Sequence, residues 1–281
     1  MKKVMSGNSV LYLVLMIAFM FVQPYVWAGE SNCFSSVKYV TPKDNRATRA
    51  LYVLVDETVP LSDDMKKRVE KLLSGWGQAG DQVKIARFSA SYRGLYPELI
   101  YSKKIDPMPD DNFMFNLHYK DKKSVMKCME MQKEEFKTSF AKALKASLKN
   151  INPKIPKSEL LGSLKLLSKQ LVSKDDAIEK TILLISDGLE NSNNLSFYSK
   201  KVVKSLNPRK EIAKLRRKGL MGYWKNANVY MYGVGLMPDK KRYSKPENVL
   251  KLKRFWEHYF VESGAKVKEI GTPELMLTSI E

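Results

Sequence analysis

ALYVLVD at positions 50–56 and TILLISDG at positions 181–188 are the two stretches that decide the fold. Each contains a short run of apolar residues; the first run is followed directly by Asp56, and the second by Ser186 and Asp187. Uninterrupted apolar runs of this length are typical of parallel strands that helices cover on both faces. We therefore expect both stretches to be central strands of one sheet.

Strand and helix patterns alternate along the rest of the chain. Further strands are predicted over 82–90, 95–101, 228–234 and 266–270, and helices over 62–75, 125–150, 158–171, 209–218, 246–264 and 273–280. The segment 106–123 contains prolines, adjacent aspartates and several lysines, and we expect it to leave the sheet, in a shape that the sequence does not predict. The polar segment 191–208 is expected to be a long loop. The alternation predicts an α/β fold, a three-layer α/β/α sandwich with a mostly parallel central sheet and one antiparallel edge strand.

The first 28 residues have the pattern of a signal peptide. Lys2 and Lys3 precede an apolar run over 10–22, and Ala28 stands at the expected cleavage position. Because this run is shorter than the roughly 20 residues that cross a membrane, a cleaved leader is favoured over an uncleaved inner-membrane anchor. We expect a periplasmic or secreted protein without a membrane span after cleavage, with an N-terminal arm over 29–49 and one domain over 50–281.

The chain has two cysteines, Cys33 and Cys128. An even number of cysteines in an exported protein favours a disulfide, which here would join the N-terminal arm to the domain. Two unpaired thiols are the alternative, because spacing alone does not show that the sulfur atoms meet.

The formal net charge of +19 at pH 7 predicts long-range attraction to anionic surfaces. The charge does not distinguish lipopolysaccharide, acidic lipid, nucleic acid and acidic protein from one another. Specific recognition of nucleic acid is not expected.

Both predicted central strands end at an aspartate, and ligands of doubly wound sheets bind beyond the carboxyl ends of such strands. Between them in the chain, Ser158 stands at a predicted helix start. This order of elements, over about residues 50–280, resembles the von Willebrand factor A domain. The resemblance implies a metal-ion-dependent adhesion site, in which an Asp-x-Ser-x-Ser stretch, a threonine and a second aspartate bind a divalent cation.

The resemblance implies four metal ligands in this chain: Asp56, Thr58, Ser158 and Asp187. Pro60 stands where the family has its second serine, so a water molecule would have to replace that ligand. Carboxylate and hydroxyl oxygens suit Mg²⁺ or Mn²⁺. In this family pattern, one coordination position stays open for a carboxylate of a protein partner.

Two other interpretations of the aspartates stay open. Asp56 and Asp187 could accept backbone hydrogen bonds and stabilise their own loops. The strand that ends in Asp56 also resembles that of Mg²⁺-dependent phosphate-ester hydrolases, with Asp56 as the nucleophile. In those enzymes a second aspartate two residues later handles protons, whereas Thr58 stands at that position here. A binding module is therefore favoured over an enzyme.

The loop after Asp187 is expected to form the rim of this site and to contact another protein, one of the cell envelope. The residues predicted to make this contact are Asn191, Asn193, Asn194, Phe197 and Tyr198. Zinc and serine chemistry are disfavoured, because His118 and His258 are the only histidines and the chain has no Gly-x-Ser-x-Gly stretch.

Overall fold

The structure is a computed structural model of the whole chain, and it describes residues 32–35, 37, 46–59, 61–89, 97–149, 159–192, 195–199, 202–237 and 245–281. The predicted signal peptide, Pro60 and Ser158 lie outside the described residues. In the part that the structure describes, no helix combines the length and the apolar character that crossing a membrane requires.

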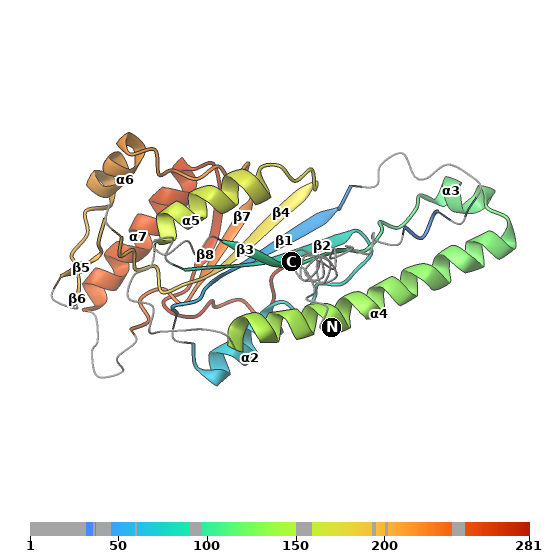
Figure 1. Cartoon of the computed structure of the whole chain (residues 1–281), viewed down its shortest axis with the longest axis horizontal. Coiled ribbons are helices and arrows are strands. Elements are labelled where there is room, and N and C mark those ends of the chain that lie inside the picture. Colours follow the sequence, from blue (N-terminus) through green and yellow to red (C-terminus); the bar gives the residue numbers. More distant parts are fainter. Residues whose placement is uncertain are drawn as a thin grey trace, which may run out of the picture. The chain divides into compact units, whose positions relative to one another are not determined.

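A six-stranded sheet forms the centre of the fold, with the strand order β3-β2-β1-β4-β7-β8 (Figure 1). Its strands are β1 (Arg49–Asp56), β2 (Asp81–Phe88), β3 (Glu98–Lys104), β4 (Glu179–Ile185), β7 (Asn228–Tyr232) and β8 (Lys266–Ile270). Five of these strands are parallel, and β3 pairs antiparallel with β2 at one edge. The two apolar stretches are β1 and β4, which lie side by side in the centre as predicted.

Helices cover both faces of the sheet, because alternate side chains of each central strand point to opposite faces. Leu51, Val53 and Val55 of β1 pack in one apolar cluster with α2 (Asp63–Leu72) and the second half of α4 (Tyr119–Lys149). Tyr52 and Leu54 pack in a second cluster. Its helices are α5 (Leu160–Leu167), α6 (Pro208–Arg217) and α7 (Pro246–Glu262). The predicted α/β/α class, with one antiparallel edge strand, is confirmed.

The first half of α4 belongs to a smaller cluster of its own. Val125 and Met129 pack there with Phe34 and with Leu117, which follows the short helix α3 (Asp111–Asn116). The Cys33–Cys128 disulfide joins this part of α4 to the N-terminal segment, which confirms the predicted pairing. The segment that was expected to leave the sheet therefore forms α3 and the beginning of α4.

The predicted helix over 273–280 is wrong. The segment instead follows α2, where the backbone N–H of Ile280 donates to Leu72 O at 2.8 Å and the indole of Trp76 donates to Ile280 O at 3.0 Å. Arg68 donates to Leu275 O at 3.0 Å. The α2 helix and its flanks thus bond backbone groups of this segment, so tertiary contacts override the local pattern.

The α5 helix begins one residue later than predicted. Its N-cap position is Glu159, and the Glu159 side chain makes no capping hydrogen bond. The predicted cap, Ser158, lies outside the described residues. A π-helical turn, η2 (Ser168–Val172), extends α5 toward β4.

Candidate functional site

The strand ends of β1 and β4 form the point where the connections of the sheet diverge. After β1 the chain passes to α2 on one face, and after β4 it passes to α6 on the other face. Val55 pairs with Ile185, so Asp56 and Ser186 follow at the same edge of the sheet. In doubly wound sheets this switch point is where ligands bind.

Asp56 is fully buried and accepts hydrogen bonds on both carboxylate oxygens. Its Oδ1 accepts from the Thr58 N–H at 2.9 Å and from the Thr58 hydroxyl at 2.6 Å. Its Oδ2 accepts from the Ser186 hydroxyl at 2.8 Å. Asp56 therefore binds two hydroxyl groups that come from the ends of different strands, and Ser186 was not among the predicted metal ligands.

Asp187 is also buried, and its Oδ1 accepts from the Leu189 N–H at 2.9 Å. Burial raises the pKa of Asp187 well above its ordinary value, and the nearby negative charge of Asp56 raises it further. The hydrogen bond from Leu189 acts in the opposite direction. The structure thus brings Asp56, Thr58 and Asp187 together and places two like charges in a poorly solvated position.

Gly188 lets the backbone turn away directly after Asp187. Its φ of 73° is in the left-handed region, which favours glycine. The indole of Trp256 in α7 donates to Gly188 O at 3.0 Å. A Cβ atom at position 188 would lie 2.6 Å from Nε1 of the buried Trp256, so both the conformation and the available space require glycine here.

Glu190 is a buried acid of this loop that sequence reasoning missed. Its Oε2 accepts from the Leu161 N–H at 2.9 Å, so it caps the start of α5 in place of a local serine. Burial raises the pKa of Glu190 to about 7. Its position three residues after Asp187 was a weak signal, and no local pattern connects it with a helix that begins 30 residues earlier.

The carboxylate and hydroxyl groups at the strand ends are suitable ligands for a hard divalent cation. All of the ligand atoms are oxygens, and a cation would relieve the repulsion between the carboxyl groups of Asp56 and Asp187. Thr58 and Ser186 supply hydroxyl oxygens next to Asp56. Among the residues that the structure describes, no group of three or more His, Cys, Asp or Glu side chains could hold a metal. The fit therefore depends on two carboxylates together with hydroxyls.

The loop predicted to contact a partner is only partly exposed. Phe197 is completely buried and packs edge-on against Phe255 of α7, with ring centroids 4.8 Å apart. This placement corrects the prediction for Phe197, because the size of its side chain favours the core over the rim. Asn191 is half-buried and forms a β-bridge with Ser196.

The structure gives little about the other predicted contact residues. Asn193 and Asn194 are outside the described residues. Tyr198 lies in β5 (Tyr198–Ser199), which pairs with β6 (Val202–Val203), and its side chain is not among those described.

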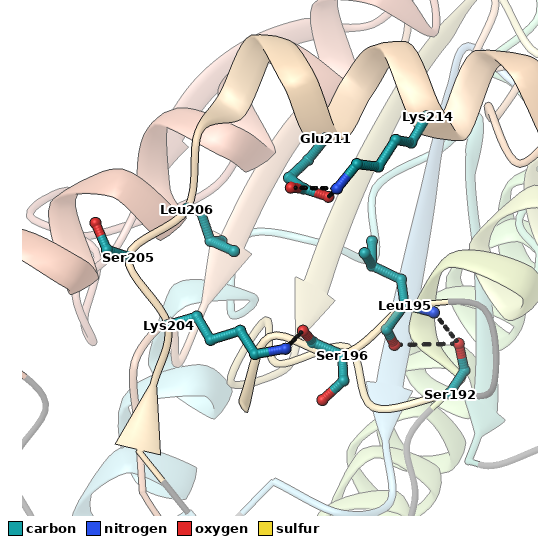
Figure 2. A pocket seen from close by; sticks show the side chains of 8 residues that line it. All are labelled: Ser192, Leu195, Ser196, Lys204, Ser205, Leu206, Glu211 and Lys214. Atoms are coloured by element: carbon teal, nitrogen blue, oxygen red, sulfur yellow. Dashed lines mark hydrogen bonds and ion pairs between the residues drawn. The ribbon is translucent and has the colours of Figure 1, made fainter. Parts of the chain in front are cut away.

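A surface pocket of about 380 Å³ lies between this loop and α6 (Figure 2). Ser192 and Leu195 line it from the loop, and their mutual hydrogen bonds hold the loop turn together. Opposite them, Lys214 of α6 forms an ion pair with Glu211 at 2.9 Å. The lining is mostly polar, with Glu211 balancing Lys214 while Lys204 donates to Ser196 O at 3.0 Å.

Comparisons with known proteins gave matches among solved structures alone. No family model matches the chain, and no curated protein matches it. An aerotolerance-related membrane protein from Bacteroides fragilis is 12% identical, with a TM-score of 0.35, over 79% of this chain and 92% of its own. The pilus adhesin SpaC from Lactobacillus rhamnosus is 13% identical, with a TM-score of 0.38, over 82% of this chain and 29% of its own.

A third similar structure is proximal thread matrix protein 1 from the mussel byssus. It is 14% identical, with a TM-score of 0.34, over 80% of this chain. This chain spans 45% of the length of that protein. Identities and TM-scores of this size are low, and the α/β/α class stands on the strand order and helical layers of the chain itself.

Proposed function

We propose that this chain is an exported, von Willebrand factor A-like binding module of the cell envelope, which engages another protein through the surface around the ends of β1 and β4. The observation that carries the proposal is the meeting of Asp56 and Asp187, both buried, at the switch point of the sheet. The antiparallel edge strand and the position of β1 beside β4 agree with the resemblance drawn from the sequence.

A divalent cation, Mg²⁺ or Mn²⁺, is part of this proposal. Asp56, Thr58 and Asp187 would hold it, with Ser186 beside them and Ser158 as the further predicted ligand. When bound, the cation would supply an electrophilic position for a carboxylate of the partner. The chain's own residues orient the site, because Thr58 and Ser186 fix both oxygens of Asp56.

Hydrolysis of phosphate esters by Asp56 is the alternative and has less support. A nucleophile must reach its substrate, whereas Asp56 is fully buried and both of its oxygens accept hydrogen bonds. Thr58 donates its hydroxyl hydrogen to Asp56, so it does not replace the proton-handling carboxylate of those enzymes.

Calorimetric titration with MgCl₂ and MnCl₂ tests the cation. We expect binding heat for the wild type and for Asp63→Asn, and none for Asp187→Ala. Asp63 is a suitable control because it is an exposed acid in the first turn of α2, paired with Lys66 at 3.0 Å. Absence of heat in the wild type would contradict the cation-dependent form of the proposal.

Two further measurements test the partner and the alternative. Pull-down from envelope extracts, with and without chelator, should yield a protein that the wild type retains only without chelator and that Asp187→Ala does not retain. An aryl phosphate supplied with Mg²⁺ tests hydrolysis. Turnover by the wild type that is lost in Asp56→Asn would support the enzyme, and equal inertness would reject it.

A further inference from the structure

A second surface pocket, of about 470 Å³, lies between the start of α6 and one side of α7. Ser205, Asn207 and Arg209 line it from the α6 side. Lys251, Arg254 and His258 line it from α7. These three residues follow one another at spacings of three and four, so they lie on the same face of the helix.

The lining of this pocket contains no acidic residue. It carries two arginines, one lysine and one histidine. The described ion pairs of α6 and α7 use other residues, since they join Lys214 to Glu211 and Arg216 to Glu262. Several cations therefore share one depression without a carboxylate among them, an arrangement that is electrostatically unfavourable until an anion binds.

The neighbouring pocket of Figure 2 gives an internal comparison, because both pockets share Ser205 and Leu206. In that pocket the charge of Lys214 is balanced by Glu211, as the dashed contacts show. The Ser205 side chain points away from that ion pair in Figure 2, and its hydroxyl accepts from Lys251 Nζ at 2.7 Å. The pocket of Figure 2 therefore keeps one lysine, Lys204, that no acid in its lining balances, whereas the pocket on the α7 side of the Ser205–Leu206 backbone has three cations and no acid.

The start of α6 adds to this positive potential. Asn207 caps the helix by accepting from the Lys210 N–H at 3.1 Å, and its carbonyl accepts from the Glu211 N–H at 3.0 Å. Pro208 has no N–H, which leaves the N–H of Arg209 as the remaining donor of the first turn. The positive end of the helix dipole therefore faces the same region as the three cationic side chains, Arg209, Lys251 and Arg254.

We propose that this pocket binds the phosphate group of an organic phosphate. A phosphate carries more charge than a carboxylate, and the planar forks of Arg209 and Arg254 can each donate two hydrogen bonds to its oxygens. The volume of about 470 Å³ exceeds that of a phosphate group, so it leaves room for an attached group. Two sources present this chemistry, a phospholipid headgroup and a soluble phosphate ester. The proposal uses no residue of the strand-end site and is independent of the proposed function.

Binding of two probes to the intact chain tests the site. The soluble probe is glycerol phosphate, measured by calorimetry, and the lipid probe is vesicles of phosphatidylglycerol in phosphatidylcholine, measured by co-sedimentation. The test variant is Arg209→Gln/Arg254→Gln. The control is Arg217→Gln/Lys253→Gln, which makes the same change in net charge on the same two helices outside the pocket.

We expect the test variant to bind at least one probe about tenfold more weakly or worse, because it removes two charged donors to the phosphate oxygens. The control and Asp187→Ala should bind like the wild type, which separates this site from the strand-end site. Binding of vesicles alone identifies a lipid headgroup, and binding of glycerol phosphate identifies a soluble ester. Equal weakening in both double variants, or no binding of either probe by the wild type, would overturn the proposal.

Discussion

The buried acids at the two ends of the central sheet have different kinds of partner. At the amino end, Asp81 is 1% exposed, and Arg49 donates to both of its oxygens at 2.9 Å. The N–H groups of Gly77 and Gln78 donate to it as well, each at 2.9 Å. Asp175, just before β4, is also buried and pairs with Lys84 of β2.

At the carboxyl end, the donors described for the buried acids are hydroxyl and backbone N–H groups. Asp56 accepts from Thr58 and Ser186, Asp187 from Leu189, and Glu190 from Leu161. The same strand, β1, therefore begins with a cation that neutralises an acid and ends with an acid beside another acid.

The pKa directions follow this difference. Burial alone would raise the pKa of Asp175, but hydrogen bonding and charge from Lys84, together with the Ala177 N–H, hold it below its usual value. The pKa values of Asp187 and Glu190 are raised instead. The charged form of Asp175 therefore stabilises the fold, whereas the charged forms of Asp187 and Glu190 destabilise it. Perturbed acids of the second kind are typical of binding and catalytic sites.

The largest expected effect comes from the amino end. Asp81→Ala should lower the free energy of unfolding by about 3–5 kcal/mol, because it leaves the partly buried charge of Arg49 and two N–H groups without their acceptor. Urea denaturation measures the loss. Asp64→Ala is the control, since Asp64 is exposed and its nearest cation, Lys67, lies 3.8 Å away. Similar losses in both variants would contradict the assigned role of the Asp81 ion pair.

The next largest effect should come from Glu190, as a dependence of the free energy of unfolding on pH. A carboxyl with a raised pKa stabilises the fold while protonated, so its contribution is complete below about pH 4.5 and is lost as the pH rises through about 7. Over this interval the wild type should lose about 3 kcal/mol of unfolding free energy relative to Glu190→Gln, which keeps an acceptor but does not ionise. Urea denaturation at several pH values measures the difference. A difference that does not vary with pH would show that Glu190 titrates normally.

Gly188→Ala should cost about 2 kcal/mol, since the new Cβ meets the buried indole of Trp256 and the φ of 73° strains an alanine. The melting temperature reports the loss. Gly162→Ala in α5 is the matched control, because nothing lies within 4 Å of its Cβ position. That variant should be neutral or slightly more stable, as alanine favours helices. Equal melting temperatures for the two variants would argue against tight packing around Gly188.

The smallest expected effect is an increase in stability. Asp187→Asn keeps an oxygen for the Leu189 N–H and removes the charge that Asp56 repels, so the unfolding free energy at pH 7 without divalent cation should rise by about 1 kcal/mol. Added Mg²⁺ or Mn²⁺ should stabilise the wild type and leave the variant unchanged. If the variant were less stable than the wild type in the absence of cation, the charge of Asp187 would not destabilise the fold, and the proposed difference between the two ends of the sheet would be wrong.

Sequence patterns predicted much of the fold and part of the site. The helix predicted over 62–75 contains α2, in which Ser62 caps the start by accepting from the Met65 N–H at 3.3 Å, and the helix predicted over 125–150 corresponds to most of α4. The aspartates were found because strand ends can be read from apolar runs. The partners of these aspartates could not be found in this way, since Ser186 is 130 residues away from Asp56 in the chain.

What the sequence by itself determined is therefore local: the strands β1 and β4, the amphipathic helices, and two cysteines that could pair. The periodicity of apolar residues and the local composition depend only on residues close in sequence, so they can be read without knowledge of the fold. Only the tertiary structure decided which acids have a cation beside them, that Glu190 caps α5, that Phe197 is buried, and that the last segment follows α2. Each of these depends on groups far apart in sequence, whose meeting is set by the pairing of strands and the packing of helices on the sheet.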